Sequence, residues 1–439
     1  MLKVVKFGGS SLASAEQFAR VKAIVESDPD RKVVVVSAPG KRFKEDNKVT
    51  DLLYICHAHI KYNASFDDVF EDIAERYRQI AAGCGLKQDL EAEFAAMKQT
   101  MNKAASVDYI VSRGEYLNAK LMAEYLGYTF IDSKDWLFFN YDGKVDFEKS
   151  YATLHELFAH AKRAVIPGFY GSMADGDIKT FSRGGSDVSG AIAAAALEAD
   201  AYENWTDVSG ILMADPRIVE NPRPIEQVTF SELRELSYMG ADVLHEETVF
   251  PVRQKNIPLY IKNTNEPAAR GTLILEDFET ESEEDKKRFV TGITGRKHYS
   301  ILTLTKARMN SEPGFIRHAL KIVEKYGVIV EHITSSIDSF SMVVSTAKVE
   351  SCLHDMTEEL QTVLSPDRIK VDHGISLVAV VGRRMASNVG VSGRLFATLG
   401  ACDINIRMIE QGADEINIII GVQDRDFKKT IRVLYDSFT

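Results

Sequence analysis

The stretch Phe181-Ser182-Arg183-Gly184-Gly185-Ser186-Asp187 stands directly before a run of mostly small residues, 189–196. Adjacent glycines let backbone amides approach a bound anion, an arginine offers a planar fork for a carboxylate or phosphate, and an aspartate can hold a metal or position a reacting group. The alanine-rich run predicts a helix, so the amides of residues 186–188 would lie at its N-terminus, where the helix dipole favours negative charge. The stretch therefore predicts an anion-binding site at the start of a helix.

Two earlier stretches predict the sheet that carries such a site. Residues 3–7 form a predicted strand that ends at Gly8-Gly9, and Ser14-Ala15-Glu16-Gln17 has the pattern of a capping box for the next helix. Residues 32–37, Lys-Val-Val-Val-Val-Ser, are typical of a strand that is buried on both faces of a parallel sheet. Because ligands of open α/β sheets bind at the carboxyl ends of the strands, we expect the Lys6 ammonium and the amides of the glycine turn at the mouth of a site.

Further polar segments follow predicted strands or open predicted helices. A polar loop leads from the second strand to Asn47-Lys48-Val49-Thr50 at the start of a helix. Ser112-Arg113-Gly114-Glu115 is predicted to open another helix, which would make Glu115 an acid of the first turn. A strand that contains Trp205 leads through Thr206-Asp207 to Asp215-Pro216-Arg217. Strand, acidic turn and basic residue thus recur.

Composition and charge limit the class of protein. With 439 residues, of which 45% are hydrophobic and 27% charged, the chain is globular and long enough for two or three domains. The net charge of −11 opposes general binding to nucleic acid or to a membrane surface, although a local basic pocket for a nucleotide is compatible with it. No apolar run approaches the roughly 18 residues of a membrane span. The first residues lack the apolar core of a secretory signal, so we expect a cytoplasmic protein, and the four cysteines show no CxxC spacing that would indicate a zinc site.

The C-terminal third predicts a separate region with an internal repeat. Acidic residues crowd into 276–285, which we interpret as part of a surface linker. Beyond it, residues 300–344 resemble residues 376–420, and each copy has the pattern strand, helix, strand, strand, helix. The expected organisation is a catalytic domain at 1–275, a linker at 276–295, and two small α/β modules at 296–372 and 373–439. An insertion of one module in the other would move the tail boundaries.

The motifs that are missing narrow the chemistry. The chain has no GxxxxGK[ST], no GxGxxG after a strand, no HRD with DFG, and no GxSxG elbow. What remains is two glycine-rich strand-to-helix turns, around Lys6 and around Asp187, together with the acids Glu115 and Asp207. This set suits transfer between two anions, because positive charge and backbone amides must hold two mutually repelling groups in line.

Taken together, these motifs resemble aspartate kinase, in order and over the entire chain. The matching segments are 6–11 (KFGGSS), 112–115 (SRGE), 168–169 (GF), 182–187 (SRGGSD), 206–211 (TDVSGI), 215–217 (DPR) and 240–245 (GADVLH). The resemblance implies the amino-acid kinase fold, an α/β fold with a mostly parallel sheet sandwiched by helices, followed by two ferredoxin-like ACT modules. Because the chain ends at Thr439, it resembles the monofunctional enzyme.

The implied reaction is transfer of the ATP γ-phosphoryl group to the side-chain carboxylate of L-aspartate. The product, 4-phospho-L-aspartate, starts the lysine, threonine and methionine pathway. A carboxylate acceptor is already deprotonated near neutral pH, so no general base is needed. Catalysis can then rest on positioning and charge compensation, with Mg²⁺ held through the phosphate oxygens of ATP and not by a cluster of protein ligands.

The resemblance also implies roles for individual residues. The catalytic residues would be Lys6 and Asp187. The residues that bind aspartate would be Thr50, Glu115, Arg183 and Ser186. Glu115 would hold the substrate ammonium and Arg183 a carboxylate. The residues that bind ATP would be Lys6, Gly8, Gly9, Ser10, Thr206, Asp207 and Arg217. Two positions depart from the pattern: Leu212 stands where relatives often have a tyrosine, and Asp242 stands where some have a lysine, so we exclude Asp242 from the site.

For the tail, the resemblance implies feedback inhibition by an amino acid and a dimer, or a dimer of dimers, formed through the ACT modules. The expected effector pocket contains Met309, Val330, Glu331, Ser335 and Ser336. Glu331 could pair with the ammonium of an effector or be a solvated acid at a strand end. Ile337 stands where a lysine-sensitive relative has an acid, which leaves lysine, threonine or no effector open.

Two other functions remain as alternatives. One is a different amino-acid kinase, acting on glutamate or on a nucleotide, against which the SRGE motif and the paired ACT tail argue. The other is a catalytically silent amino-acid sensor, against which Lys6, Glu115, Arg183 and Asp187 argue, since all four are present.

Overall fold

A computed structural model describes residues 1–182, 184–241, 244, 246–278, 289–385, 388–412 and 416–439 of the chain. The chain forms two compact units. The first contains Met1–Ile211, Pro224–Phe230 and Val243–Phe278, and the second contains Leu212–Arg223, Ser231–Asp242 and Glu279–Thr439. None of the helices in the described part of the chain combines the length and the apolar character needed to span a membrane.

An eight-stranded, mostly parallel sheet forms the centre of the first unit, in the order β11-β13-β12-β8-β1-β2-β5-β3. Its strands are β1 (Lys3–Phe7), β2 (Arg31–Val36), β3 (Thr129–Phe130), β5 (Ala164–Pro167), β8 (Ala201–Thr206), β11 (Gln227–Thr229), β12 (Leu259–Asn263) and β13 (Thr272–Leu275). The pair formed by β12 and β13 is antiparallel. A separate three-stranded sheet consists of β4 (Phe138–Phe139), β6 (Tyr170–Met173) and β7 (Ile178–Thr180).

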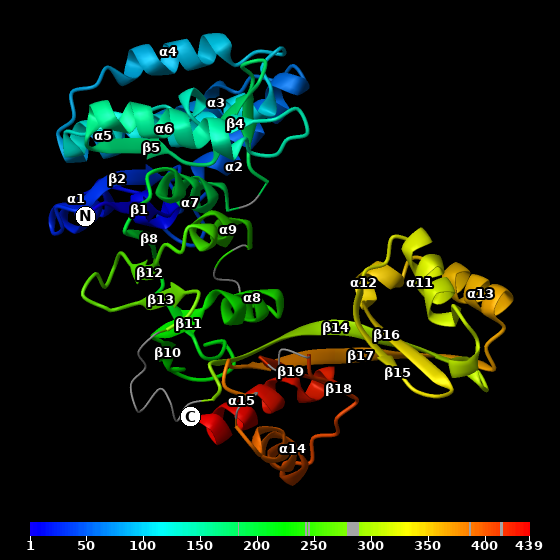
Figure 1. Cartoon of the computed structure of the whole chain (residues 1–439). Coiled ribbons are helices and arrows are strands. Elements are labelled where there is room, and N and C mark those ends of the chain that lie inside the picture. The colour runs from blue at the N-terminus through cyan, green and yellow to red at the C-terminus, as the bar shows by residue number, and fades with distance from the viewer. Residues whose placement is uncertain (183, 242–243, 245, 279–288, 386–387, 413–415) are drawn as a thin grey trace. The chain divides into compact units, whose positions relative to one another are not determined.

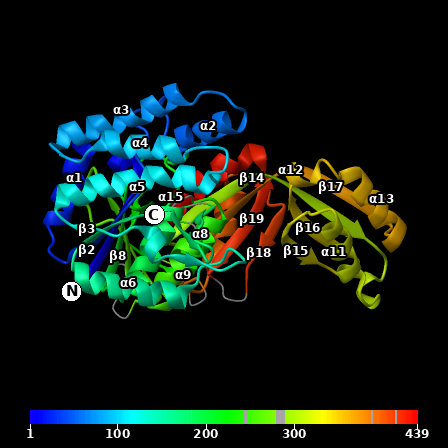
Figure 2. The same ribbon diagram turned by 90° about the horizontal axis from the view of Figure 1, so that it is seen from above.

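Helices cover both faces of this sheet (Figure 1). They are α1 (Ala15–Glu26), α2 (Val49–Lys61), α3 (Asp67–Cys84), α4 (Leu90–Thr100), α5 (Val107–Leu126), α6 (Phe147–Ala161), α7 (Gly185–Ala196) and α9 (Glu246–Gln254), with short 3₁₀ turns at Gly9–Leu12 and Ser133–Asp135. Apolar side chains of α1 to α5 form one core with alternate residues of β1 and β2, and Figure 2 shows α3, α4 and α5 side by side. Helix α7 packs on the other face, with α6 and α9 against it.

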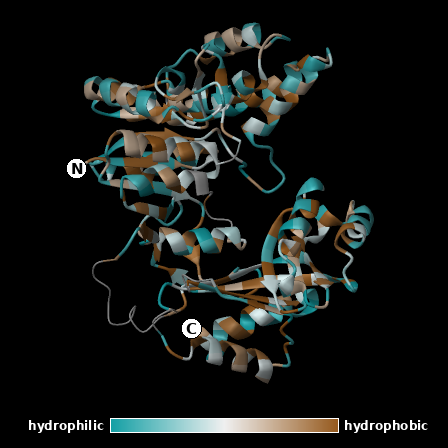
Figure 3. Cartoon of the chain, turned by 45° about the vertical axis from the view of Figure 1, so that its right-hand side comes forward, coloured by the Kyte–Doolittle hydropathy of each residue, from teal (hydrophilic) through white to brown (hydrophobic). Residues whose placement is uncertain are grey.

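The sequence explains this layering. Val5, Phe7, Val34 and Val36 face the core with α1 to α5. On the opposite face, Val4, Val33 and Val35 are equally buried. A strand covered on both faces needs apolar residues at consecutive positions, because successive side chains point to opposite faces. Hydrophobic residues accordingly concentrate on the strands of the sheets and on the helix faces turned toward them (Figure 3). The prediction of a parallel sheet sandwiched by helices is confirmed.

The second unit is built on a six-stranded antiparallel sheet in the order β15-β16-β14-β17-β19-β18. Its strands are β14 (Gly292–Thr305), β15 (Val330–Ser335), β16 (Ser339–Ser345), β17 (Arg368–Val381), β18 (Met408–Glu410) and β19 (Asn417–Gln423). Its helices are α8 (Phe230–Tyr238, of which Phe230 falls in the first unit), α11 (Phe315–Lys325), α12 (Thr346–Val349), α13 (Leu353–Leu364), α14 (Val391–Ala401) and α15 (Phe427–Phe438), with 3₁₀ turns at Met309–Ser311 and Asp424–Asp426. The short strands β9 (Ile211–Leu212) and β10 (Pro224–Ile225) pair where the chain leaves the first unit and returns to it.

Two long strands are shared between the repeated modules. Residues 299–305 of β14 pair with β16 and with the first part of β17, whereas residues 292–296 of β14 pair with residues 377–381 of β17, which also pair with β19. The beginning of β14 therefore completes the sheet of the second module, and the first module is inserted within it. Because β14 begins at Gly292, the last four residues of the predicted linker 276–295 are strand; their glycines hid the strand pattern. Residues 279–288 of that linker lie outside the described residues.

Candidate active site

Lys6 and Asp187 form an ion pair at the carboxyl edge of the main sheet. Lys6 is the penultimate residue of β1, Asp187 lies in the first turn of α7, and the distance from Lys6 Nζ to Asp187 Oδ1 is 2.5 Å. Lys6 is 7% exposed. The two glycine turns singled out in the sequence are thereby brought together, as their place at the strand ends predicted.

The turn after β1 is held close to the turn after β2. The Gly8 amide donates to the Trp205 carbonyl at 3.0 Å, and the Gly40 amide donates to the Gly9 carbonyl at 2.8 Å. A Cβ on Gly9 would lie 2.8 Å from the Ala38 carbonyl oxygen, which leaves no room for a side chain. Residues 9–12 form a 3₁₀ turn, and the first amides of a helix have no acceptor within it, so the amides of Gly9 and Ser10 stand at a terminus suited to an anion.

The glycine stretch before α7 adopts the conformation that its composition suggested. Gly184 has φ 57° as the N-cap of α7, a left-handed conformation that favours glycine. Ser186 is buried against Gly168, where a Cβ would come within 2.6 Å of the Ser186 Cβ. Arg183 lies outside the described residues, so its predicted contact with aspartate stays a prediction.

Glu115 lies in the middle of α5 and not in its first turn, which corrects the sequence interpretation. Helix α5 begins at Val107, because the Ser106 side chain caps it by accepting from the Tyr109 amide. Glu115 is 4% exposed, and its Oε2 has no hydrogen-bond partner in the described part of the chain. Burial raises the pKa of Glu115 to about 8, although the Ala38 amide and the Arg113 charge act in the opposite direction. A buried carboxyl group with a free oxygen is suited to receive a cation.

Thr50 is positioned by a loop whose anchors the sequence did not reveal. Thr50 is the second residue of α2, and the Val49 amide donates to the Pro39 carbonyl at 3.1 Å. Arg76 of α3 is 4% exposed and donates to the carbonyls of Gly40 and Asn47, both at 2.9 Å, and to Asp46 Oδ1 at 2.7 Å. No sequence motif marks Arg76, because its role depends on a loop about 30 residues away being folded onto α3.

Thr206 and Asp207 also reach the carboxyl edge. Thr206 ends β8, and its carbonyl accepts from the Thr264 amide at 2.8 Å. Asp207 is exposed. Arg217 belongs to the second unit, where it pairs with Asp215 at 2.8 Å. Most of the predicted catalytic and ATP-binding residues thus lie together at the ends of neighbouring strands: Lys6, Gly8, Gly9, Ser10, Asp187, Thr206 and Asp207. Arg217 is part of the second unit, so its predicted contact with ATP stays a prediction.

Comparison with known proteins assigns the chain to a family. A model of the amino acid kinase family matches residues 1–263, and a model of the ACT domain matches residues 378–438. Aspartokinase 3 of Bacillus subtilis is 38% identical over 452 aligned positions, which cover 100% of this chain and 98% of that protein. The chain belongs to the aspartokinase family. It is an aspartate kinase by class, and the predictions of fold, family and enzyme class are confirmed.

Solved structures agree with this assignment over the full length. The crystal structure of Clostridium acetobutylicum aspartate kinase matches this chain with a TM-score of 0.91 and a sequence identity of 47%. The match covers 100% of both chains. Escherichia coli aspartokinase III in complex with aspartate and ADP is 26% identical with a TM-score of 0.76, over 100% of this chain and 99% of that one. The same enzyme in complex with lysine and aspartate has a TM-score of 0.75.

In the ACT region of this aspartokinase, the predicted effector residues fall into two groups. Val330 and Glu331 begin β15, and the Tyr238 hydroxyl of α8 is bonded to Glu331. Ser335 ends β15, and Ser336 follows it in the turn to β16. Met309 lies near this turn, because the Asn310 amide donates to the Ile337 carbonyl at 3.1 Å. A strand rises about 3.3 Å per residue, so Glu331 lies about 13 Å along β15 from Ser335 within one chain.

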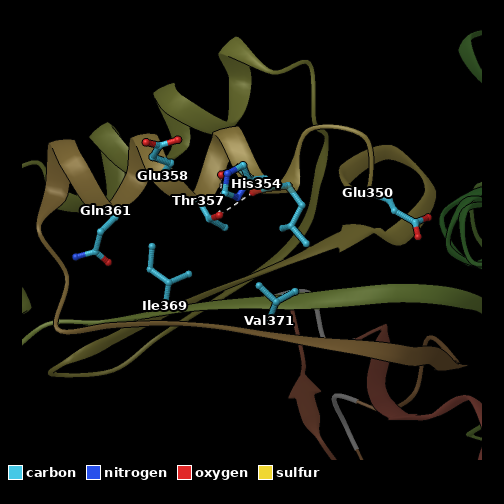
Figure 4. Close-up of a pocket in the computed structure, with 8 residues that line it drawn as sticks. Glu350, His354, Thr357, Glu358, Gln361, Ile369 and Val371 are labelled. Atoms are coloured by element: carbon cyan, nitrogen blue, oxygen red, sulfur yellow. Dashed lines mark hydrogen bonds between the residues drawn. The ribbon is translucent and has the colours of Figure 1, made fainter.

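A separate groove lies between α13 and β17 (Figure 4). Its lining residues are Glu350, Leu353, His354, Thr357, Glu358, Gln361, Ile369 and Val371. Ile369 and Val371 rise from the strand toward the helix, and the polar side chains come from the helix side. None of the five predicted effector residues lines this groove, so it supplies control positions for tests of the effector pocket.

Proposed function

We propose that the first unit of this aspartokinase transfers the γ-phosphoryl group of ATP to the side-chain carboxylate of L-aspartate, with Lys6 and Asp187 as its catalytic residues. The observation that carries the proposal is the ion pair between Lys6 and Asp187, which joins the two glycine-rich turns at one sheet edge. A carboxylate oxygen of aspartate forms a bond to the γ-phosphorus while the bond to the β-phosphate oxygen breaks and ADP leaves. No proton moves, so the site needs only to align and compensate negative groups.

The aspartate side consists of Thr50, Glu115, Ser186 and Arg183. Glu115 receives the substrate ammonium on its free Oε2, which supplies the partner that this buried oxygen lacks in the described part of the chain. Thr50 and Ser186 each stand in the first turn of a helix, α2 and α7, where the dipole favours a carboxylate. Arg183 precedes α7 in the sequence and supplies the positive fork for a carboxylate.

The ATP side consists of Lys6, the turn Gly8-Gly9-Ser10, and Thr206, Asp207 and Arg217. Packing of Gly9 against the backbone of Ala38 and Gly40 fixes this turn, and its first amides are the groups suited to phosphate oxygens. Mg²⁺ held through the phosphate oxygens of ATP would neutralise part of their charge. Lys6 compensates the charge that develops on the transferred group.

For the ACT region we propose that an amino acid binds near Met309, Val330, Glu331, Ser335 and Ser336 and inhibits the enzyme. The two ends of β15 are too far apart for one small ligand within a single chain, so we propose that a second copy of the chain completes the pocket in a dimer. Glu331→Gln should raise the concentration of effector needed for half inhibition. Glu358→Gln, in the separate groove of the same module, is the matched control and should leave it unchanged.

An aspartate hydroxamate assay with ATP and Mg²⁺ tests the reaction. The wild-type protein should form hydroxamate only when aspartate, ATP and Mg²⁺ are all present. The assay is then repeated with lysine, threonine and methionine, and the pattern of inhibition identifies the effector. Absence of aspartate-dependent turnover in every condition would overturn the proposal.

The role of Glu115 has a test of its own. Because burial raises the pKa of Glu115 to about 8, the group is mostly protonated at pH 7, and an ammonium bound to it must displace the proton. Aspartate binding at pH 7 should therefore release close to one proton, measured by titration calorimetry in two buffers of different ionisation enthalpy. In Glu115→Gln the release should disappear. An unchanged release in that variant would remove Glu115 from the ammonium site.

A further inference from the structure

We propose that Asn204 is a positioning residue that fixes the carboxylate of Asp187 against Lys6. The inference rests on the proposed function, because it concerns the geometry of the proposed catalytic pair. Asn204 belongs to none of the motifs that identify the family in this sequence.

The position of Asn204 follows from the sheet register. Strands β1 and β8 are parallel neighbours, and Lys6 is paired with Asn204. Paired residues on adjacent strands point to the same face, so both side chains face α7, whose first turn carries Asp187. Asn204 is 4% exposed, so bulk water is excluded where its amide contacts the ion pair of Lys6 and Asp187.

Asn204 and Lys6 bind the same oxygen of Asp187. Asn204 Nδ2 donates to Asp187 Oδ1 at 3.0 Å, and Lys6 Nζ lies 2.5 Å from that oxygen. The orientation of the amide is determined, because an ionised carboxylate only accepts hydrogen bonds. Two donors on Oδ1 set the rotation of the carboxylate, while neither of them occupies Oδ2. Oδ2 is thereby left for the reacting groups.

A second residue of β8 holds the backbone at the same point. Tyr202 lies two positions before Asn204, on the same face, and its hydroxyl donates to the Asp187 carbonyl at 3.0 Å. A Cβ on Gly190 would lie 2.4 Å from the Tyr202 hydroxyl, so the small residue on α7 makes room for this contact. Tyr202 anchors the main chain of Asp187, and Asn204 orients its side chain.

The carbonyl oxygen of the Asn204 side chain, Oδ1, argues against a purely structural role. This oxygen is buried and has no hydrogen-bond partner in the described part of the chain. An unsatisfied buried acceptor destabilises a protein, whereas leucine has nearly the same shape and no polar atom to satisfy. Fold stability alone would therefore favour leucine here, and the amide is explained by its bond to Asp187.

Asn204→Leu is the decisive variant. A hydrogen bond to a charged group corresponds to a change of about tenfold to one-hundredfold in rate, and we expect kcat to fall by that factor. The KM values for aspartate and ATP should change less than about threefold, because alignment is lost and not ground-state binding. The melting temperature should be unchanged or higher. A folded variant with kcat within twofold of wild type would overturn the inference.

Two further variants separate positioning from shape. Asn204→Asp keeps the shape but places a carboxylate against Asp187, so its kcat should be lower than that of Asn204→Leu. In an Asp187→Ala background, Asn204→Leu should lower kcat no further, because the two residues act as one unit. Losses that multiply in the double variant, or equal kcat values for the Asp and Leu variants, would contradict the inference.

The control is Gln227→Leu, which removes another amide with an unpartnered buried oxygen from the same unit, on β11. It should leave kcat unchanged. The proposed function is tested with the wild-type protein. If the wild type shows no aspartate-dependent turnover, the proposed function fails. Turnover in the wild type with no loss in Asn204→Leu refutes only the role of Asn204.

Discussion

Burial changes the chemistry of Glu115 more than any sequence pattern suggests. The carboxyl group is 4% exposed, and it is held in the interior of α5. Burial raises its pKa from 4.5 to about 8. Between these two pH values the folded protein keeps a proton on Glu115, whereas the unfolded chain releases it. A group of this kind stabilises the folded state fully below about pH 4.5, and its contribution is lost as the pH rises through about 8.

Glu115→Gln should remove this pH dependence from the unliganded protein. Above pH 8 the variant should be more stable than the wild type, on the order of 5 kcal/mol, because it carries no buried charge. At pH 4.5 the two proteins should be nearly equal in stability. Urea unfolding at pH 5, 7 and 9 measures the difference, and a difference that does not grow with pH would contradict the raised pKa.

Lys6 is the residue whose loss should affect turnover most. Lys6→Met keeps the apolar stem in β1 but removes the charge that faces Asp187. We expect kcat to fall by about a thousandfold, because the compensating charge for the transferred group is gone. Lys262→Met is the matched control: Lys262 is a half-buried lysine of β12 whose ammonium lies 5.2 Å from the centre of the Trp205 ring. Circular dichroism should show that both variants are folded, and near-wild-type turnover of Lys6→Met would exclude Lys6 from catalysis.

At the scale of elements, the loop between β2 and α2 is held by a buried cluster of charges. Asp46 is 8% exposed and receives Arg76 Nη2 at 2.7 Å and Arg42 Nε at 2.9 Å. Burial alone would raise the pKa of Asp46, but hydrogen bonds from Arg42 and the charges of Arg76 and Arg42 outweigh it and hold the pKa below its usual range. This cluster determines where Gly40 meets Gly9 and where Thr50 lies in the first turn of α2.

Arg76→Met should therefore reduce both stability and substrate binding. Removal of one partner from a buried ion pair costs about 3 kcal/mol. The KM for aspartate should rise, because Thr50 is no longer fixed. Arg78→Met, on the same helix but with exposed partners, should change the free energy of unfolding much less. Equal effects of the two substitutions on unfolding free energy and on KM would show that the loop does not depend on Arg76.

The same cluster should contribute to acid unfolding. A carboxyl group with a lowered pKa stabilises the folded state above its unfolded pKa of 3.8, and that contribution is lost as the pH falls through its folded value. Asp46→Asn should be less stable than the wild type at pH 7, and the difference should shrink below about pH 3.8. A constant difference from pH 7 to pH 3 would show that folding does not lower the pKa of Asp46.

At the scale of the whole molecule, the chain passes between its two compact units after residues 211, 223, 230, 242 and 278. Segments from within the predicted domain 1–275 are bonded into the second unit. The Ile293 amide donates to the Met213 carbonyl at 2.7 Å, and Arg383 Nη1 lies 2.9 Å from Glu232, which is fully buried. The compact units therefore do not divide at the predicted domain boundary, residue 275.

A chain of residues 1–278 should consequently fold poorly. It would keep Glu232 but lose Arg383 and Thr291, which bind its carboxylate in the full chain. Thermal unfolding followed by circular dichroism and light scattering should show aggregation and no cooperative transition. The control is the full chain cut at a protease site placed in the acidic segment 279–288, which should remain folded because both pieces are present. A cooperative transition of the fragment 1–278 at the temperature of the full chain would contradict this expectation.

The sequence by itself determined the elements and the chemistry of this aspartokinase. Consecutive valines in β2 predicted a strand covered on both faces, and Gly-Gly turns beside Lys6 and Asp187 predicted the edge where the two residues meet. Such patterns are local, because strand burial, glycine turns and helix starts depend on residues a few positions apart. The repeated pattern of the tail likewise predicted its two modules.

Only the tertiary structure decided which distant residues support that chemistry. The partner of Asp187 on β8, the anchor of the 40–48 loop on α3 and the depth of Glu115 within α5 each depend on elements that are far apart in the chain. In the sequence alone, nothing distinguishes Asn204 of β8 or Arg76 of α3 from residues on the surface, because their burial results from tertiary packing. Burial turns such side chains into strong constraints, because a buried donor or charge must find a partner where water cannot supply one.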